Sequence, residues 1–286
     1  MRDKFKQRLI EIAVEIDRVC RENNLRYFLM GGSLLGAIRH DGIIPWDDDI
    51  DIAMPREDYE KLRKISQTAF QSRFRFATHD LDKDYPYFYA KVFHQETTFV
   101  ELEDPFYLGG VFVDVFPIDG LPSNRFLMNL HYKRFYFWRK ICKYTTLKKM
   151  VCDGSRFKQT MQNVAHRLIN ALVTNTFAIS QCDRVAKKYL FDDCEYVANL
   201  CGAYGKKEIT LKTNMDTYKE HVFEGYNLLI PEGYENILTK TYGDYMQLPP
   251  EEKRVSRHNH FYLNLDKRIT RKEDVYSDLS SCSDLV

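Results

Sequence analysis

Apolar residues recur along the first part of the chain with the period of a helix. Steps of three and four residues separate Phe5, Leu9, Ile12, Ile16 and Val19. This spacing places them on one face and predicts an amphipathic helix over 4–22. A second helix is predicted over 56–70, where Pro55 ends the preceding strand.

Other segments alternate with the period of a strand. In 49–54, acidic Asp49 and Asp51 alternate with apolar Ile50 and Ile52, which predicts one acidic and one apolar face. Further strands are predicted over 25–30, 73–77, 86–93, 97–101 and 111–116. In the third of these, one face would carry Tyr85, Tyr87, Tyr89 and Lys91. Such a row suits a cleft wall, and it equally suits a half-exposed strand.

From about residue 121 the segments become long and mostly helical. The stretch 125–150 combines many lysines, arginines and aromatic residues with no acid. It could contact an anionic membrane or a polyanionic acceptor, or it could pack by its aromatics with a solvated basic face. We therefore predict an α+β fold, with a catalytic core over 1–122 and a mostly helical part over 123–286 packed on it.

Composition narrows the class of protein. Of the 286 residues 44% are hydrophobic and the net charge is +1, so a folded core is expected and a nucleic-acid partner is not. The seven cysteines are scattered without a CxxC pair, which favours reduced thiols. The charged N-terminus does not resemble a signal peptide, and no long apolar run is present. We expect a cytoplasmic protein.

The carboxylates are the candidate chemistry. On a strand, Asp49 and Asp51 would point to the same side and could hold one cation, for which Mg²⁺ is the natural choice. Asp114 lies alone in an apolar strand, where a buried acid needs a cation or a hydrogen-bonding partner, and a salt bridge would also serve. Glu101 and Asp119 are its nearest rivals. Asp47 and Asp48, just before the strand, are expected to support the site.

A glycine pair supplies the complementary half. Gly31 and Gly32 permit a close backbone approach, and the following helix start, with the Ser33 hydroxyl, could bind phosphate. The segment lacks the Gly-Lys-Ser/Thr ending of a P-loop. The aspartate cluster lacks the central glycine and distal glutamate of an EF-hand.

These segments resemble a known family. The stretch GGSLLGAIRHDGIIPWDDDIDIAM (31–54) is similar to the signature of the LicD family, which includes the fukutin-type proteins and belongs to the DNA polymerase β-like nucleotidyltransferases. The resemblance continues in VDVFPIDGLP (113–122) and in 223–258. The middle of the chain, 125–215, matches in length and helical character alone.

The resemblance implies a nucleotidyltransferase fold with a mixed sheet flanked by helices. It implies that Gly32 and Ser33 hold phosphate and that Asp49, Asp51 and Asp114 are the catalytic acids, binding two divalent ions, Mg²⁺ or Mn²⁺. The implied reaction moves phosphocholine, or a related alcohol phosphate, from CDP-choline or a similar CDP-alcohol to a hydroxyl of a polysaccharide or teichoic acid precursor, releasing CMP. Asp114 would be the general base.

Several further residues are candidate contacts. Arg39, Lys91 and Arg254 could bind the donor's phosphates, or could be ordinary surface or salt-bridging bases. His258 and His260 could serve as acid–base or phosphate groups, or be structural. Trp46 and the tyrosine row could stack a cytosine or enclose a quaternary ammonium, although core packing also explains Trp46.

Other functions remain open at the level of sequence. A sugar-nucleotide glycosyltransferase also uses an Asp-x-Asp pair, and a nucleotide-binding screen by thermal shift would separate the two. A non-catalytic binding protein on the same fold is the other alternative. For the transferase, the acceptor could be a lipid-linked anionic precursor, with peripheral contact between the basic segment and the inner face of an anionic membrane.

Overall fold

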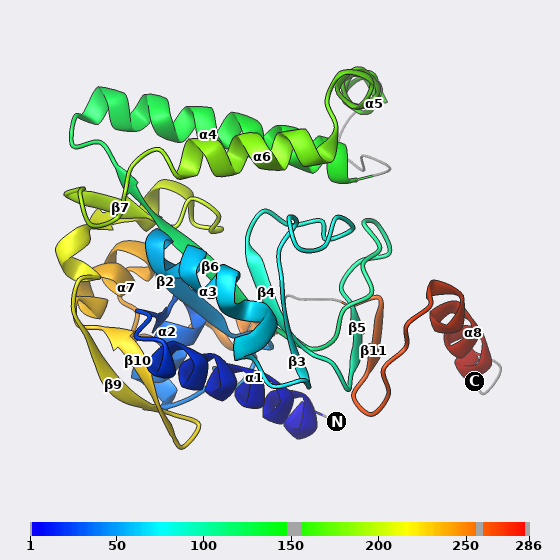
Figure 1. Ribbon diagram of the computed structural model, residues 1–286, viewed down its shortest axis with the longest axis horizontal. Helices are drawn as coiled ribbons and strands as arrows, with labels where there is room; N and C mark the ends of the chain where they lie inside the picture. Colours follow the sequence, from blue (N-terminus) through cyan, green and yellow to red (C-terminus); the bar gives the residue numbers. More distant parts are fainter. Residues whose placement is uncertain (1, 148–155, 256–259, 284–286) are drawn as a thin grey trace.

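A mixed sheet forms the centre of the computed structural model, which describes residues 2–147, 156–255 and 260–283 (Figure 1). Its main strands run in the order β1-β2-β6-β4-β3, and β7 and β8 extend it beyond the far end of β6. β2 and β6 are parallel, whereas the other pairs are antiparallel. The strands are β1 (Phe28–Leu29), β2 (Asp51–Pro55), β3 (Phe74–Ala77), β4 (Ala90–His94), β6 (Phe112–Leu121), β7 (Tyr196–Ala198) and β8 (Ile209–Leu211).

Three helices from the first part of the chain pack on this sheet. They are α1 (Arg2–Glu22), α2 (Gly31–His40) and α3 (Arg56–Ala69). The predicted apolar stripe of α1 is buried against β4 and β6, with Ile12, Ile16 and Val19 fully covered. The predicted helices over 4–22 and 56–70 and the α+β class are thereby confirmed.

A second layer of helices covers one end of the sheet. α4 (Arg125–Thr146) and α6 (Asn175–Ala186) run side by side, and α5 (Arg156–Leu172) lies at the end of α4 (Figure 1). Phe135 and Cys142 of α4 share a core with Ile179 and Cys182 of α6, and this core reaches Leu121 at the end of β6. β6 therefore carries the chain from the central sheet into the helical layer.

The remaining elements close the periphery. The hairpin of β9 (Tyr218–Phe223) and β10 (Tyr226–Pro231) packs beside β1 and is followed by α7 (Tyr234–Tyr242). β5 (Thr98–Val100) pairs with β11 (Tyr262–Asn264), and α8 (Lys272–Ser283) follows. Short 3-10 turns span Gly205–Glu208, Lys212–Asn214 and Glu251–Lys253. Beyond residue 122 the chain thus contributes strands as well as helices.

Several predicted boundaries are corrected. The strand expected over 25–30 is reduced to Phe28–Leu29, and the strand expected over 49–54 begins at Asp51, so Asp49 lies in the preceding loop. In β2, ladder pairing begins only where β6 and β1 lie alongside it as partners. The strand expected over 86–93 begins at Ala90, because Pro86 cannot donate to a ladder and the chain bends at 88–89.

β6 is longer than the expected strand over 111–116. It continues to Leu121 because its second half pairs with β2 on one side and with β7 on the other.

The predicted thiol state also holds for the described cysteines. Free thiols are found at Cys20, Cys142, Cys182, Cys194 and Cys201. Among the described helices, none is both long and apolar enough to cross a membrane.

Candidate functional site

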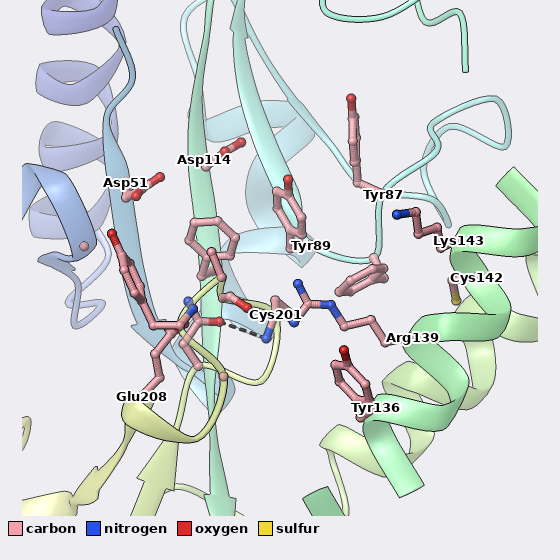
Figure 2. Close-up of a pocket in the computed structure, with 18 of the residues that line it drawn as sticks. Asp51, Tyr87, Tyr89, Asp114, Tyr136, Arg139, Cys142, Lys143, Cys201 and Glu208 are labelled. Carbon is pink, nitrogen blue, oxygen red and sulfur yellow. Dashed lines mark hydrogen bonds between the residues drawn. The ribbon is translucent and has the colours of Figure 1, made fainter. Parts of the chain in front are cut away.

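Two acids and one lysine lie in a row across three neighbouring strands. Asp51 of β2 pairs in register with Asp114 of β6, and Asp114 pairs in turn with Lys91 of β4. Register partners point to the same side of a sheet, so the three side chains converge. Figure 2 shows Asp51 and Asp114 on adjacent strands above the same cavity. Asp51 and Asp114, far apart in sequence, are therefore neighbours across the sheet.

Lys91 is the cationic partner of Asp114. Its ammonium Nζ lies 2.7 Å from Asp114 Oδ1 and 3.3 Å from Glu101 Oε2, and only 1% of the side chain is exposed. Burial alone would lower the pKa of Lys91, but the Asp114 and Glu101 carboxylates outweigh it and the pKa is raised. Lys91 is thus a charged group that pairs with two acids. A salt bridge was one possibility for Asp114 from the sequence alone, and Lys91 provides it.

Several carboxylates surround Asp51 and change the pKa of its side chain. Burial raises the pKa of its carboxyl well above the usual value, and the nearby carboxylates of Asp49, Asp114 and Asp47 raise it further, against the opposing effect of Lys91. A group of carboxylates that repel one another is stabilised by a cation between them.

The donor set of this cluster fits a magnesium-type ion in part. The acids offer hard oxygen ligands, but in the described part of the chain no three His, Cys, Asp or Glu side chains converge closely enough to hold a metal by themselves. Mg²⁺ is commonly held by one or two carboxylates together with substrate phosphates and water. The residues present therefore suit an ion that is completed by a phosphate-bearing ligand.

Two nearby carboxylates explain why Gly31 and Gly32 have no side chains. A Cβ at Gly31 would lie 2.8 Å from Asp51 Oδ2, and one at Gly32 would lie 2.8 Å from Asp47 Oδ2. Gly31 also has φ +59°, a backbone conformation that favours glycine. α2 begins at Gly31, so the glycines form its first turn, whereas the sequence predicted the helix to start just after them.

Ser33 anchors the strand that carries Asp51. It is buried, and its Oγ accepts a hydrogen bond of 2.8 Å from the Asp51 backbone N–H. This bond fixes the start of β2 against the first turn of α2. The hydroxyl expected to face phosphate is thus used to position the acid.

Two cavities adjoin at Asp49 and Asp51. The larger, of about 840 Å³, is called the aromatic pocket. The smaller, of about 740 Å³, is called the tryptophan pocket. Both are lined by Asp49, Asp51, Ala203 and Tyr204. Asp114 and Gly31 line the aromatic pocket, and Gly32 and Asp47 line the tryptophan pocket.

The aromatic pocket lies between the sheet and α4 (Figure 2). Of the tyrosine row, Tyr87 and Tyr89 line it, whereas Tyr85 is fully buried in a separate cluster with Phe93. The opposite wall comes from α4 and from the loop before β8. Its polar and aromatic members include Tyr132, Tyr136, Arg139, Lys140, Lys143, Asn199 and Glu208.

Arg139 was not identified as a site residue from the sequence. Its guanidinium donates to the carbonyl oxygens of Gly202 at 2.8 Å and Leu200 at 3.4 Å, which fixes the loop that carries Tyr204. The signal lay in the spacing of Tyr132, Tyr136, Arg139 and Lys143, which places all four on one face of a helix.

The tryptophan pocket contains the predicted Trp46 and Arg39. The guanidinium carbons of Arg39 and Arg254 lie 5.9 and 5.7 Å from the Trp46 ring. Arg39 donates to the carbonyl oxygen of Tyr245 at 3.0 Å, and Arg254 to that of Pro249 at 2.7 Å. The two arginines are therefore gathered around one ring.

The two histidines predicted from the sequence are not among the described residues that line the two pockets. His258 lies outside the described residues. His260 is exposed, and its ring lies 5.5 Å from that of Phe99, away from the residues that line the two pockets.

The rivals of Asp114 have structural roles. Asp119 is fully buried and accepts two hydrogen bonds from Arg56, of 2.7 and 2.9 Å. Glu101 accepts from the Tyr87 hydroxyl at 2.6 Å and shares Lys91. Of the three candidates, Asp114 is the acid in register with Asp51.

Comparison with known proteins places the chain among its relatives. Residues 24–153 match the family model described as LicD/FKTN/FKRP, nucleotidyltransferase domain. The chain is 31% identical over 247 residues to the lipopolysaccharide cholinephosphotransferase LicD of Haemophilus influenzae, covering 84% of this chain and 89% of that protein. It is 50% identical over 57 residues to the human ribitol 5-phosphate transferase FKRP, covering 20% of this chain and 12% of that protein.

Proposed function

Because the chain belongs to the LicD family and is a phosphotransferase, we propose that it transfers phosphocholine, or a related alcohol phosphate, from a CDP-activated donor to a hydroxyl of a cell-surface polysaccharide or teichoic acid precursor, releasing CMP. The observation that carries the proposal is the register of Asp51 with Asp114 at the edge of two cavities that share Asp49 and Asp51. The choice of phosphocholine follows the relative that matches most of this chain.

The donor occupies the tryptophan pocket in this proposal. Its walls offer Arg39 and Lys253 for phosphate and Trp46, Tyr242 and Tyr245 for stacking of a base. Gly32 brings the first turn of α2 to the same pocket, where helix N–H groups favour an anion.

The acceptor occupies the aromatic pocket. Sugar rings present apolar faces, which aromatic side chains such as Tyr89 and Phe116 can cover. Asp114 lines this pocket, so an acceptor hydroxyl bound there approaches the acid that is to receive its proton.

The side chains of the site then orient the donor and the acceptor for one direct transfer step. The acceptor oxygen forms a bond to the donor phosphorus, the bond from that phosphorus to the CMP oxygen breaks, and the hydroxyl proton passes to Asp114. Lys91 donates a charged hydrogen bond to Asp114 and holds its side chain in place beforehand. Mg²⁺ or Mn²⁺, in two ions held by Asp49, Asp51 and Asp114 with the donor's phosphates, would offset charge on the leaving group.

Release of CMP tests the proposal. Purified protein with Mg²⁺, CDP-choline and a polysaccharide precursor should release CMP, and the Asp49→Ala/Asp51→Ala variant should lose this activity. A matched control is Asp84→Ala/Asp193→Ala, which removes two exposed acids. Equal CMP release by the first variant and the wild type would refute the assignment of the acids.

A binding screen tests the donor separately. With Mg²⁺ present, CDP-choline should raise the unfolding temperature more than UDP- or GDP-sugars do. A larger shift with a UDP- or GDP-sugar would replace the proposed donor by a sugar nucleotide.

A further inference from the structure

Helix α4 exposes apolar side chains on the face that points away from the protein core. Phe126, Leu130 and Phe137 are 75%, 55% and 55% exposed, although they recur at helical spacing. The opposite side of α4 packs inward through Phe135 and Cys142, each 2% exposed. The helix therefore has two apolar sides, of which one is covered by the protein.

Helix α5 adds a second exposed stripe. Met161, Val164, Leu168 and Leu172 fall on one side of the helix and are 55%, 49%, 60% and 83% exposed. Single exposed apolar residues are normal on proteins, but two neighbouring helices that each expose a stripe indicate a binding surface. We call these residues, with Phe126, Leu130 and Phe137, the outer face.

The charged residues of α4 and α5 are all basic. Lys133, Arg134 and Lys140 flank the apolar residues of α4, and Arg167 lies on α5. Neither helix contains an aspartate or a glutamate, although the chain has 41 acidic residues. A surface of basic and apolar side chains complements a partner that is both anionic and apolar.

We propose that the outer face of α4 and α5 binds an anionic lipid surface. Apolar side chains enter the boundary between headgroups and acyl chains while lysines and arginines pair with lipid phosphates. A second copy of the chain is a poorer occupant, because two acid-free basic faces would repel each other.

The location of the outer face has a consequence for the cavity beneath it. Lys140 and Lys143 of α4 line the aromatic pocket, so the lipid surface would lie beside that pocket. A lipid-linked acceptor could then reach the acids while anchored. This consequence rests on the proposed function, whereas the lipid-binding surface itself does not.

Vesicle sedimentation tests the surface without any measurement of activity. The wild-type protein should pellet with vesicles of phosphatidylcholine and phosphatidylglycerol, and pellet far less with phosphatidylcholine alone or in high salt. The Lys133→Gln/Arg134→Gln variant should bind roughly thirty-fold more weakly. The Leu168→Ser/Leu172→Ser variant should bind at least about ten-fold more weakly.

Matched controls separate this surface from general charge and stickiness. Lys64→Gln/Lys83→Gln removes two exposed lysines elsewhere, and Val222→Ser removes an apolar residue of β9 that is 48% exposed. Both should bind vesicles like the wild type. All the substituted side chains are exposed, so the unfolding temperatures should stay close to that of the wild type.

Two results would overturn the proposal. The first is a lack of specific binding: either the wild-type protein stays in the supernatant with phosphatidylglycerol vesicles, or the outer-face variants bind as well as the wild type. The other is a dimer in analytical ultracentrifugation that the same outer-face substitutions dissociate, which would make the face a contact between copies of the chain.

Discussion

Lys91 donates a hydrogen bond of 2.7 Å to Asp114 across the β4–β6 ladder, and Asp114 lines the aromatic pocket. The pair places a fixed positive charge next to the acid that is in register with Asp51. Lys91 therefore stabilises the acidic row before any ligand binds.

Replacing Lys91 by methionine should destabilise the protein. The change leaves the carboxylates of Asp114 and Glu101, with 13% and 31% exposed side chains, without their shared cation. Loss of one partner of a buried pair costs about 3–5 kcal/mol. Urea unfolding should show this loss in metal-free buffer, and Mg²⁺ should restore part of it.

Lys61 provides the control for this change. It pairs with Asp58 at 3.0 Å but is 61% exposed, so Lys61→Met should cost less than about 1 kcal/mol. Equal unfolding midpoints for Lys91→Met and Lys61→Met would contradict the role given to Lys91.

The Arg56–Asp119 pair should stabilise the fold without taking part in transfer. Arg56→Met should cost about 3–5 kcal/mol, because Asp119 is fully buried. The double variant Arg56→Met/Asp119→Leu should recover much of that loss, since no unpaired charge remains. Turnover per folded molecule should stay near the wild-type value, and a double-mutant cycle with strongly additive losses would argue against the coupling.

Gly31→Ala should impair activity more than stability. The new methyl group would strain a residue at φ +59° and press on Asp51 Oδ2, 2.8 Å away. The strain costs about 1–2 kcal/mol, and displacement of Asp51 should lower kcat on the order of 100-fold. CMP release and thermal unfolding measure the two effects.

Gly225 is the matched position for this test. Its φ is +83°, but no atom lies within 4 Å of an added Cβ. Gly225→Ala should show a similar loss of stability and keep its activity. If Gly225→Ala were as inactive as Gly31→Ala, contact with Asp51 would not be the cause.

Glu208 should make stability depend on pH. Burial raises the pKa of its carboxyl from 4.5 to about 7, so the folded protein binds a proton there that the unfolded chain releases. Its unfavourable contribution is absent below about pH 4.5 and grows as the pH rises to about 7. Glu208→Gln should therefore be more stable than the wild type at pH 8, by up to about 3 kcal/mol.

The same substitution should change little at pH 4.5, where the folded-state carboxyl is protonated and the unfolded-state carboxyl is about half protonated. Urea unfolding at the two pH values measures the difference. An equal effect of Glu208→Gln at both values would show that packing, and not ionisation, governs this position.

The local pattern of the chain predicted the elements around the site better than their pairing. Helical spacing identified α1, the segment after Pro55 was expected to form α3, and the isolated acid in an apolar strand identified Asp114. The preference for Asp114 over Glu101 and Asp119 depends on strand register, which pairs it with Asp51 across 63 residues of sequence. Local periodicity contains no information on which distant strand becomes the neighbour.

Side-chain partners were the hardest part to predict. The sequence offered Lys91 and Ser33 as phosphate contacts, and the structure engages them with Asp114 and with the Asp51 backbone. Arg139 reaches the site because α4 lies over the sheet, a packing relation that its basic and aromatic composition does not specify. Such contacts follow from tertiary structure and not from residue type.

The aromatic pocket and the tryptophan pocket adjoin at Asp49 and Asp51, and this arrangement has a kinetic and a stereochemical consequence. Asp49, Asp51 and Tyr204 line both cavities, so the proposed donor and acceptor sites adjoin. We therefore expect both substrates to bind at the same time and to react without a covalent enzyme intermediate. Initial-rate plots should then intersect in the manner of a ternary-complex mechanism. A donor made chiral at the transferred phosphorus should give a product of inverted configuration.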